Sequence, residues 1–206
     1  MASFGLKEML MKTKAFIKEV KLAIMATLVL AVLLCGIYPA LVWGIAQIGF
    51  SSRANGSLVL RDGRILGSRL IAQGFTGAQY FHPRPSAAGD GYDAANSGAS
   101  NLGPLSQKLV DQVTERVAAY RAENSIALSV KLPADAVTAS ASGLDPHISV
   151  RNAELQSVRV ATVRGISEAA VRSLIHSHTD GPDLGFLGEP GVNVFELNLA
   201  LDASKG

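Results

Sequence analysis

The amino-acid sequence predicts an α+β protein with a single N-terminal transmembrane helix, followed by one small mixed soluble domain. An uncharged, mostly apolar run extends from Leu22 to Ser52, and a helix needs only roughly 20 apolar residues to cross a bilayer. The rest of the chain, about 150 residues, mixes helix-like and strand-like patterns and has a normal size for one domain. We therefore divide the chain into a basic segment (1–21), a transmembrane helix (22–50) and a soluble domain (51–206).

The charge pattern around the apolar run predicts how the chain is placed in the membrane. Segment 1–21 contains five lysines and two glutamates, a charge of +3. Lysines on this side favour a cytoplasmic N-terminus, so we expect the soluble domain outside the cytoplasm. The whole chain has a formal net charge of +2, which leaves −1 for the remainder and argues against a domain that binds nucleic acid.

Several residues of the apolar run are expected to anchor the helix. Tyr38 and Trp43 lie toward its far end, where amphipathic aromatic rings favour the membrane–water interface. Pro39 is expected to kink the helix or to mark a packing site.

The run is too long for the apolar part of a cleaved signal peptide. Cys35 is the only cysteine, so the chain forms no internal disulfide.

The first half of the soluble domain is expected to contain a hairpin, a long loop and a helix. Residues 58–66 predict a β-hairpin, because Asp62-Gly63 is typical of a type I′ turn. Residues 73–103 are rich in small and polar residues without periodicity, and a loop of this length is usually functional or disordered. Pro104 is predicted to open a helix that ends near Asn124. Its apolar stripe comprises Leu105, Leu109, Val113, Val117 and Tyr120.

The second half is expected to add two helices and two strands. Residues 126–132 predict a short strand, and residues 149–163 predict a helix. Another helix is predicted to begin at Ser167, which can cap it, and to end at Gly181-Pro182. Alternating apolar residues predict a final strand over 192–201. Together, these patterns predict a soluble domain with a small sheet and about three helices.

No established catalytic or metal-binding motif occurs in the sequence. It lacks a phosphate-binding loop, an H-E-x-x-H zinc motif and a G-x-S-x-G nucleophile elbow. His176 and His178 are interpreted as solvated charges at a helix C-terminus, and His147 as a turn residue. We therefore predict no catalytic residue and no metal site.

The long loop carries the remaining functional signal. Residues 73–77 and 80–86 place aromatic rings, amides and a guanidinium beside glycines. Such a segment is either a packed surface loop or a binding face for a protein or small ligand, and the residues alone do not decide between these readings. Replacing Gly77 or Gly143 by valine is expected to damage function if these glycines need a positive φ or a close backbone approach.

These same segments resemble the C subunit of bacterial potassium-transporting P-type ATPases, the KdpC family. The resemblance extends over most of the chain and includes the single N-terminal membrane helix. Its blocks are Ala54–Leu58, Gly67-Ser68, Gln73–Gly77, Tyr80–His82, Arg84–Ser86, Asn96–Gly98, Ser100–Leu102, Val137–Asp145 and Val192–Asp202.

The resemblance implies a non-catalytic accessory subunit of a high-affinity potassium uptake complex in the bacterial inner membrane. The implied partners are a potassium-binding channel-like subunit, an ATP-hydrolysing P-type subunit and a small membrane subunit. The family's role has been described as a catalytic chaperone that raises the ATP affinity of the pump subunit. No cofactor would be held firmly, ATP would be met only through the pump subunit, and potassium is the transported ion. The expected ligand or subunit contacts are Gln73, Phe75, Thr76, Gly77, Tyr80, His82, Arg84 and Asp145.

Other interpretations remain open at this stage. One is an extracytoplasmic module that caps the potassium subunit, because a domain outside the cytoplasm does not meet cytoplasmic ATP. Another is a membrane-anchored enzyme that uses His82, Asp145 or His147, although no nucleophile–base spacing supports it. A third is a solitary periplasmic binding module.

Overall fold

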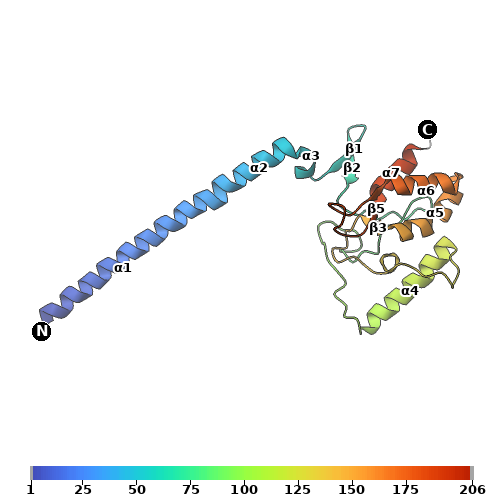
Figure 1. Ribbon diagram of the computed structural model, residues 1–206. Coiled ribbons are helices and arrows are strands. Elements are labelled where there is room, and N and C mark those ends of the chain that lie inside the picture. The colour runs from blue at the N-terminus through green and yellow to red at the C-terminus, as the bar shows by residue number, and fades with distance from the viewer. Residues whose placement is uncertain (1, 205–206) are drawn as a thin grey trace. The chain divides into compact units, whose positions relative to one another are not determined.

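The structure, a computed structural model, describes residues 2–204 and the side chains of residues 12–204. The chain divides into two compact units, Met1–Asn55 and Gly56–Gly206. The first is almost entirely helical and the second contains both helices and strands (Figure 1). The predicted fold class is thereby confirmed.

The first unit is one long helix followed by a short helical turn. Helix α1 (Ala2–Ala31) continues through a π-helical segment (Val32–Ile37) into α2 (Tyr38–Gly49), and α3 (Ser51–Ala54) follows. The part from Lys12 to Gly49, 38 residues, is long and apolar enough to cross a membrane.

Pro39 does not interrupt the long helix. A proline has no N–H to donate to the carbonyl four residues earlier, and the wider π-helical turns directly before it accommodate this missing bond. Tyr38 and Trp43 expose most of their surface within the chain, as side chains that face lipid or a partner helix do.

The predicted hairpin opens the second unit. Strands β1 (Leu58–Arg61) and β2 (Arg64–Ser68) pair antiparallel, with a register shift after Val59. Asp62 and Gly63 both have positive φ, 53° and 75°, as a type I′ turn requires.

The long loop after the hairpin is ordered by a second loop, residues 140–144. The N–H groups of Ala72 and Gly98 donate to the carbonyls of Leu144 and Ser142, at 2.9 and 3.0 Å. The Ser86 hydroxyl donates to the carbonyl of Gly143 at 2.6 Å. Segments distant in sequence are therefore fixed to one another without regular secondary structure.

Helix α4 (Gln107–Asn124) begins later than predicted. Pro104 and Leu105 lie in a preceding turn, and Ser106 is the N-cap residue. Leu105 is 98% exposed and so is not part of the apolar stripe. The predicted end at Asn124 is confirmed, because Ser125 adopts the left-handed conformation that ends many helices.

The strand predicted over residues 126–132 is wrong. This stretch consists of turns, followed by a short 3₁₀ helix (Ala134–Ala136). The guanidinium of Arg121 donates to the carbonyls of Ala127 and Val130. These carbonyls therefore bind a side chain in place of a neighbouring strand.

The core of the second unit is formed by three helices and a three-stranded sheet. Strand β3 (His147–Ser149) leads into α5 (Val150–Arg164), then α6 (Glu168–Ser177) and β4 (Thr179–Asp180) follow. Strand β5 (Gly191–Asn193) pairs antiparallel with both β3 and β4 and leads into α7 (Val194–Ala203). Within this core, α6 contacts both α5 and α7 (Figure 1).

Helix caps follow the sequence closely. The side chains of Ser149 and Ser167 accept hydrogen bonds from the N–H groups of Asn152 and Ala170 and cap α5 and α6. Helix α6 nevertheless ends at Ser177, before Gly181, because the chain turns into β4. His147, expected in a turn, lies in β3.

The strand predicted over 192–201 is wrong beyond Asn193. The Asn193 side chain accepts a hydrogen bond from the N–H of Glu196 and caps a helix there. Helix α7 is buried on several sides, so its apolar residues fill most positions and also give an alternating pattern. In the described residues the second unit therefore contains four α-helices and two small sheets. The buried cluster comprises Phe81, Ile148, Ala153, Val160, Ala161, Val171, Ile175, Val192, Val194, Leu197 and Leu201.

Candidate functional site

Two buried amide side chains hold the loop segment 78–82 against the core. Asn198 of α7 accepts a hydrogen bond from the N–H of Phe81 at 2.8 Å and donates to its carbonyl at 2.9 Å. Gln156 of α5 binds the N–H and carbonyl of His82 in the same way, at 2.8 and 3.1 Å. Each side-chain amide thus forms the pair of hydrogen bonds that the backbone of a neighbouring strand would otherwise form. These bonds fix Phe81 in the core, where it has no exposed surface.

Two arginines of α5 donate hydrogen bonds to backbone carbonyls of the same segment. Arg159 donates to the carbonyl of Tyr80 at 2.9 Å, and burial lowers the pKa of its guanidinium. Arg164 donates to the carbonyl of Gln79 at 2.7 Å and forms an ion pair with Asp202 at 2.9 Å. The guanidinium of Arg164 also lies 5.0 Å from the centre of the Tyr80 ring.

Most of the residues that the sequence singled out are part of this internal network. The Tyr80 hydroxyl donates to Asp202, and the Tyr80 ring lies 5.3 Å from that of Phe75. His82 lies between the Glu123 carboxylate and the Gly77 carbonyl, with both contacts at 3.1 Å. Arg84 pairs with Asp145 at 2.9 Å. These contacts agree with the interpretation of this segment as a packed surface loop. They connect the loop to the helices and the sheet of the core.

Gln73 and Thr76 differ from the other candidates. Thr76 is exposed, and Gln73 lines a cavity of about 510 Å³ together with Gly74 and Tyr92. The cavity lining contains neither lysine nor arginine. Phosphate groups would find no cationic partner in this lining.

Arg84 and Asp145 line a separate cavity of about 400 Å³ with His147. The His147 ring contacts Asp180 at 3.0 Å and Asp145 at 3.9 Å. No serine, threonine or cysteine is within hydrogen-bond distance of this ring among the contacts of the described residues. Within that part of the chain, no three His, Cys, Asp or Glu side chains are placed to hold a metal ion.

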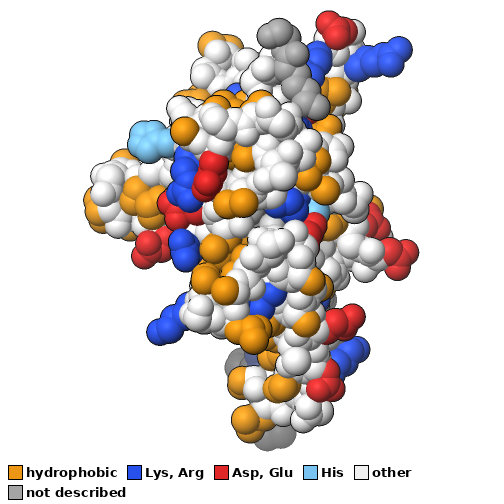
Figure 2. Space-filling view, turned by 90° about the vertical axis from the view of Figure 1, so that its right-hand side faces the viewer, with side chains coloured by type: hydrophobic (Ala, Val, Ile, Leu, Met, Phe, Trp, Pro, Cys, Tyr) orange, Lys and Arg blue, Asp and Glu red, His pale blue; other side chains and the backbone are white. Residues whose placement is uncertain are grey.

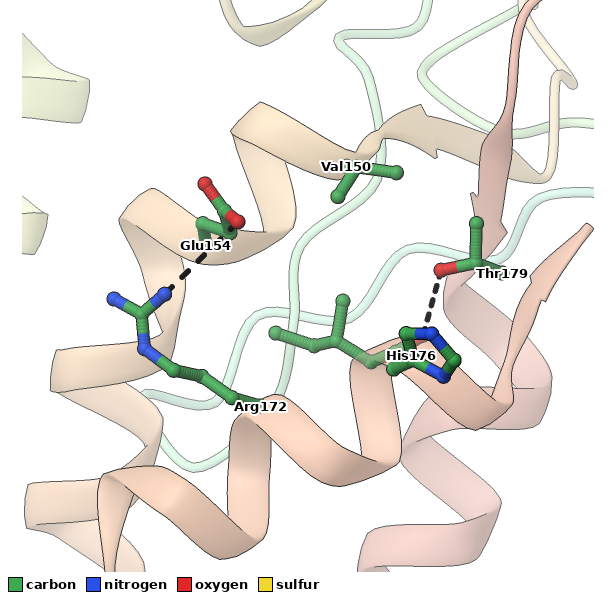
Figure 3. A pocket seen from close by; sticks show the side chains of 6 residues that line it. Val150, Glu154, Arg172, His176 and Thr179 are labelled. Atoms are coloured by element: carbon green, nitrogen blue, oxygen red, sulfur yellow. Dashed lines mark hydrogen bonds and ion pairs between the residues drawn. The ribbon is translucent and has the colours of Figure 1, made fainter.

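A third cavity, of about 350 Å³, lies between α5 and α6 (Figure 3). Val150 and Ile175 form its apolar wall, and Glu154 and Arg172 form an ion pair of 3.9 Å across one side. The Thr179 hydroxyl is already used, since it donates to the carbonyl of Ile175. Of the histidines discussed in the sequence, His176 lines this cavity, whereas none of the expected ligand or subunit contacts does.

The sequence reasoning missed an apolar turn at residues 183–187. Its two ends are joined by hydrogen bonds between Asp183 and Leu187 in both directions, at 2.8 and 2.9 Å. Leu184 and Phe186 are 83% and 74% exposed, and Leu187 is also exposed. Leu184 has a φ of 54°, which is unfavourable for a leucine. A hydrogen-bonded turn that displays three large apolar side chains is typical of a docking element.

The ionised side chains of the segment that contains this apolar turn are all acidic. Asp183 lies in the turn, Asp180 and Glu189 lie on either side of it in the sequence, and residues 179–191 contain no lysine or arginine. On the face of the molecule drawn in Figure 2, acidic and basic side chains are interspersed among apolar ones. The turn therefore favours a protein surface that is apolar with a neutral or basic rim.

A family model described as "KdpC: K+-transporting ATPase, c chain" matches residues 20–203. The chain therefore belongs to the KdpC family. The match includes the apolar part of the long helix and nearly all of the second unit, so it covers both parts of the chain.

Relatives in the KdpC family are similar along nearly their whole length. The potassium-transporting ATPase KdpC subunit of Koribacter versatilis is 52% identical over 188 residues, which is 91% of this chain and 96% of that protein. The KdpC subunit of Mycobacterium bovis is 56% identical over 180 residues, 87% and 95% of the two chains. That of Nitratidesulfovibrio vulgaris is 56% identical over 188 residues, 91% and 95%.

These matches confirm the family that the sequence blocks indicated. Members of the KdpC family are subunits of a potassium-transporting ATPase, which agrees with the prediction of a subunit that is not an enzyme by itself. The long apolar helix agrees with anchoring of such a subunit in the membrane.

Proposed function

We propose that this KdpC-family chain is an accessory subunit needed for assembly and activity of a high-affinity, ATP-driven potassium uptake complex. Its partners would be the potassium-binding channel-like subunit, the ATP-hydrolysing P-type subunit and the small membrane subunit. The observation that carries the proposal is the family match, which includes both the membrane helix and the soluble domain.

The apolar turn at residues 183–187 supports a role in docking. Burying a leucine or phenylalanine side chain contributes about 1.5–3 kcal/mol, and Leu184 and Phe186 are mostly exposed in the isolated chain. The hydrogen bonds between Asp183 and Leu187 fix the turn in advance, so little conformational entropy would be lost on binding. In this proposal the turn inserts into an apolar depression on a partner subunit.

The soluble domain is proposed to lie outside the cytoplasm, where it would cap the external face of the potassium-binding subunit. The lysine-rich segment 1–21 supports this orientation. A role as a chaperone that raises ATP affinity would instead require the domain to reach the cytoplasmic nucleotide. The Gln73 cavity is the place to consider for such a contact, and its lining offers no cation for phosphate. The geometry favours capping.

The docking role is tested by substituting the apolar turn in the full complex. We expect the double variant Leu184→Ser and Phe186→Ser to lose most of the potassium-stimulated ATPase activity and to co-purify poorly with the other subunits. Leu105→Ser is the matched control, because Leu105 is 98% exposed but lies far along the chain from the turn. Full activity and normal subunit stoichiometry in the double variant would contradict docking through this turn.

Orientation is tested separately with a membrane-impermeant maleimide on intact cells. Ser129→Cys in a Cys35→Ser background places one thiol at an exposed position that has no positive φ. Labelling before lysis would agree with capping from outside. Labelling only after lysis would place the domain in the cytoplasm and make ATP contact the leading role.

A further inference from the structure

The β1–β2 hairpin exposes an apolar face that nothing in the rest of the described chain covers. Leu60 and Ile65 are 61% and 62% exposed, and Leu58 is also exposed. Leu60 and Ile65 are register partners, and Leu58 lies two residues before Leu60. Because side chains alternate along a strand, the three lie on the same face. The same alternation places Val59 and Arg61 on the opposite face, and both line a groove against Leu199 of α7 that Leu60 also borders.

The tip of the hairpin holds two arginines directly opposite each other. Arg61 and Arg64 are register partners on either side of the Asp62-Gly63 turn. Like charges in this arrangement destabilise a hairpin. Arg61 donates a hydrogen bond to the carbonyl of Leu199 at 3.5 Å, but neither guanidinium forms an ion pair with a carboxylate among the described residues. Residues 51–70 contain four arginines and one aspartate. Arg69 is neutralised by Glu196 at 2.6 Å. The arrangement at the tip is suited to binding anions.

Chain length keeps the hairpin close to the bilayer. The uncharged helical part of the anchor, from Leu22 to Gly49, is about 42 Å long at 1.5 Å per residue and so matches a whole bilayer with its headgroups. Leu58 follows Gly49 by nine residues. Four of the intervening residues form α3, so this connection spans at most about 25 Å.

We infer that the β1–β2 hairpin lies on the membrane, with Leu58, Leu60 and Ile65 in the interfacial layer and Arg61 and Arg64 on the phosphates of anionic lipids. An apolar face combined with basic residues is the pattern of segments that bind at an anionic bilayer surface. The hairpin would thus seat the soluble domain on the membrane before any partner subunit binds. This inference does not depend on the side of the membrane or on the docking role of residues 183–187.

The test uses the full chain alone in nanodiscs, either of phosphatidylcholine with phosphatidylglycerol or of phosphatidylcholine only. A fluorescent probe is attached at Ile65→Cys in a Cys35→Ser background, and quenching by doxyl-labelled lipid is compared with quenching by aqueous iodide. The matched control carries the probe at Leu105→Cys, since Leu105 is equally apolar and fully exposed. We expect lipid quenching at position 65 and iodide quenching at position 105.

A second experiment replaces the two arginines at the tip of the hairpin. Arg61→Gln with Arg64→Gln should weaken the partitioning of the hairpin into the anionic bilayer by about 30-fold, because each basic residue near the surface contributes about a factor of five. Far-UV circular dichroism checks that the labelled and substituted chains keep their fold, and a probe at Leu60→Cys repeats the measurement on the paired position.

Equal iodide quenching at positions 65 and 105 in anionic nanodiscs would overturn the inference. So would protection of position 65 only after the other subunits are added, because the hairpin would then dock on protein. Protection that is the same in both lipid compositions and insensitive to the arginine substitutions would refute the role assigned to the anionic lipid.

Discussion

Replacing Gly143 by alanine should destabilise the soluble domain more than replacing any glycine in open space. Gly143 has a φ of +68°, and an added Cβ would lie 2.7 Å from both the Cβ and the backbone nitrogen of Ala88 and 2.9 Å from the carbonyl oxygen of Gly98. Two of these neighbours are backbone atoms of the ordered loop, so they cannot simply rotate away. Gly165 is the matched control, with a φ of +69° and no atom within 4 Å of the added Cβ.

Both substitutions place an alanine in the left-handed backbone conformation, but only the one at Gly143 also forces the new Cβ against neighbouring atoms. A left-handed alanine costs about 1–2 kcal/mol in either place, and overpacking adds about 1–3 kcal/mol at Gly143 only. We therefore expect a loss of about 2–5 kcal/mol for Gly143→Ala and about 1–2 kcal/mol for Gly165→Ala.

Thermal unfolding of the purified full chain in detergent measures this difference. One kcal/mol corresponds to about 2–4 °C in Tm for a domain of this size, so Gly143→Ala should unfold several degrees below Gly165→Ala. Equal shifts would refute the close approach of the two loops. Gly77 should tolerate alanine better than Gly143, because its added Cβ meets only the side chain of Gln79 and its φ is not positive.

Two further predictions concern the buried polar network. Asn198→Leu should lower the free energy of unfolding by about 2–6 kcal/mol in urea titrations, because the N–H and carbonyl of Phe81 each lose their partner; Gln107→Leu on the exposed side of α4 is the control, and equal losses would contradict the clamp. Burial raises the pKa of Tyr120 above its ordinary value of 10.0. The unfolded chain therefore ionises first, and the stability present below pH 10.0 is lost as the pH rises above it. Tyr120→Phe should reduce this alkaline loss, and an unchanged pH profile would exclude Tyr120 as its source.

Local signals in the sequence predicted local structure well. The Asp62-Gly63 turn and the capping residue Ser167 act within a few residues, and the structure confirms both. The final helix was mistaken for a strand because burial on several sides makes most of its positions apolar, and a helix of this kind has no clear amphipathic period. The cap at Asn193 was the signal that would have identified it.

The candidate site could not be resolved in the same way, because its contacts join residues far apart in the chain. Gln156 lies 74 residues from His82, and Asn198 lies 117 residues from Phe81. A tyrosine, histidine and arginine in a glycine-rich loop have the composition of a binding face, whether their polar atoms point outward or are hydrogen-bonded within the domain. Only the fold shows that Tyr80, His82 and Arg84 have internal partners.

The distribution of polarity also explains why an accessory role suits this chain. Its chemically versatile side chains are largely engaged in holding loops to the core, whereas the hairpin and the turn 183–187 each expose three or more large apolar side chains. The hairpin is flanked by arginines and the turn by carboxylates. An anionic lipid surface attracts the first and repels the second. The two proposed contacts therefore do not compete, and one domain can rest on the membrane through the hairpin while it presents the acidic, apolar turn to a protein partner.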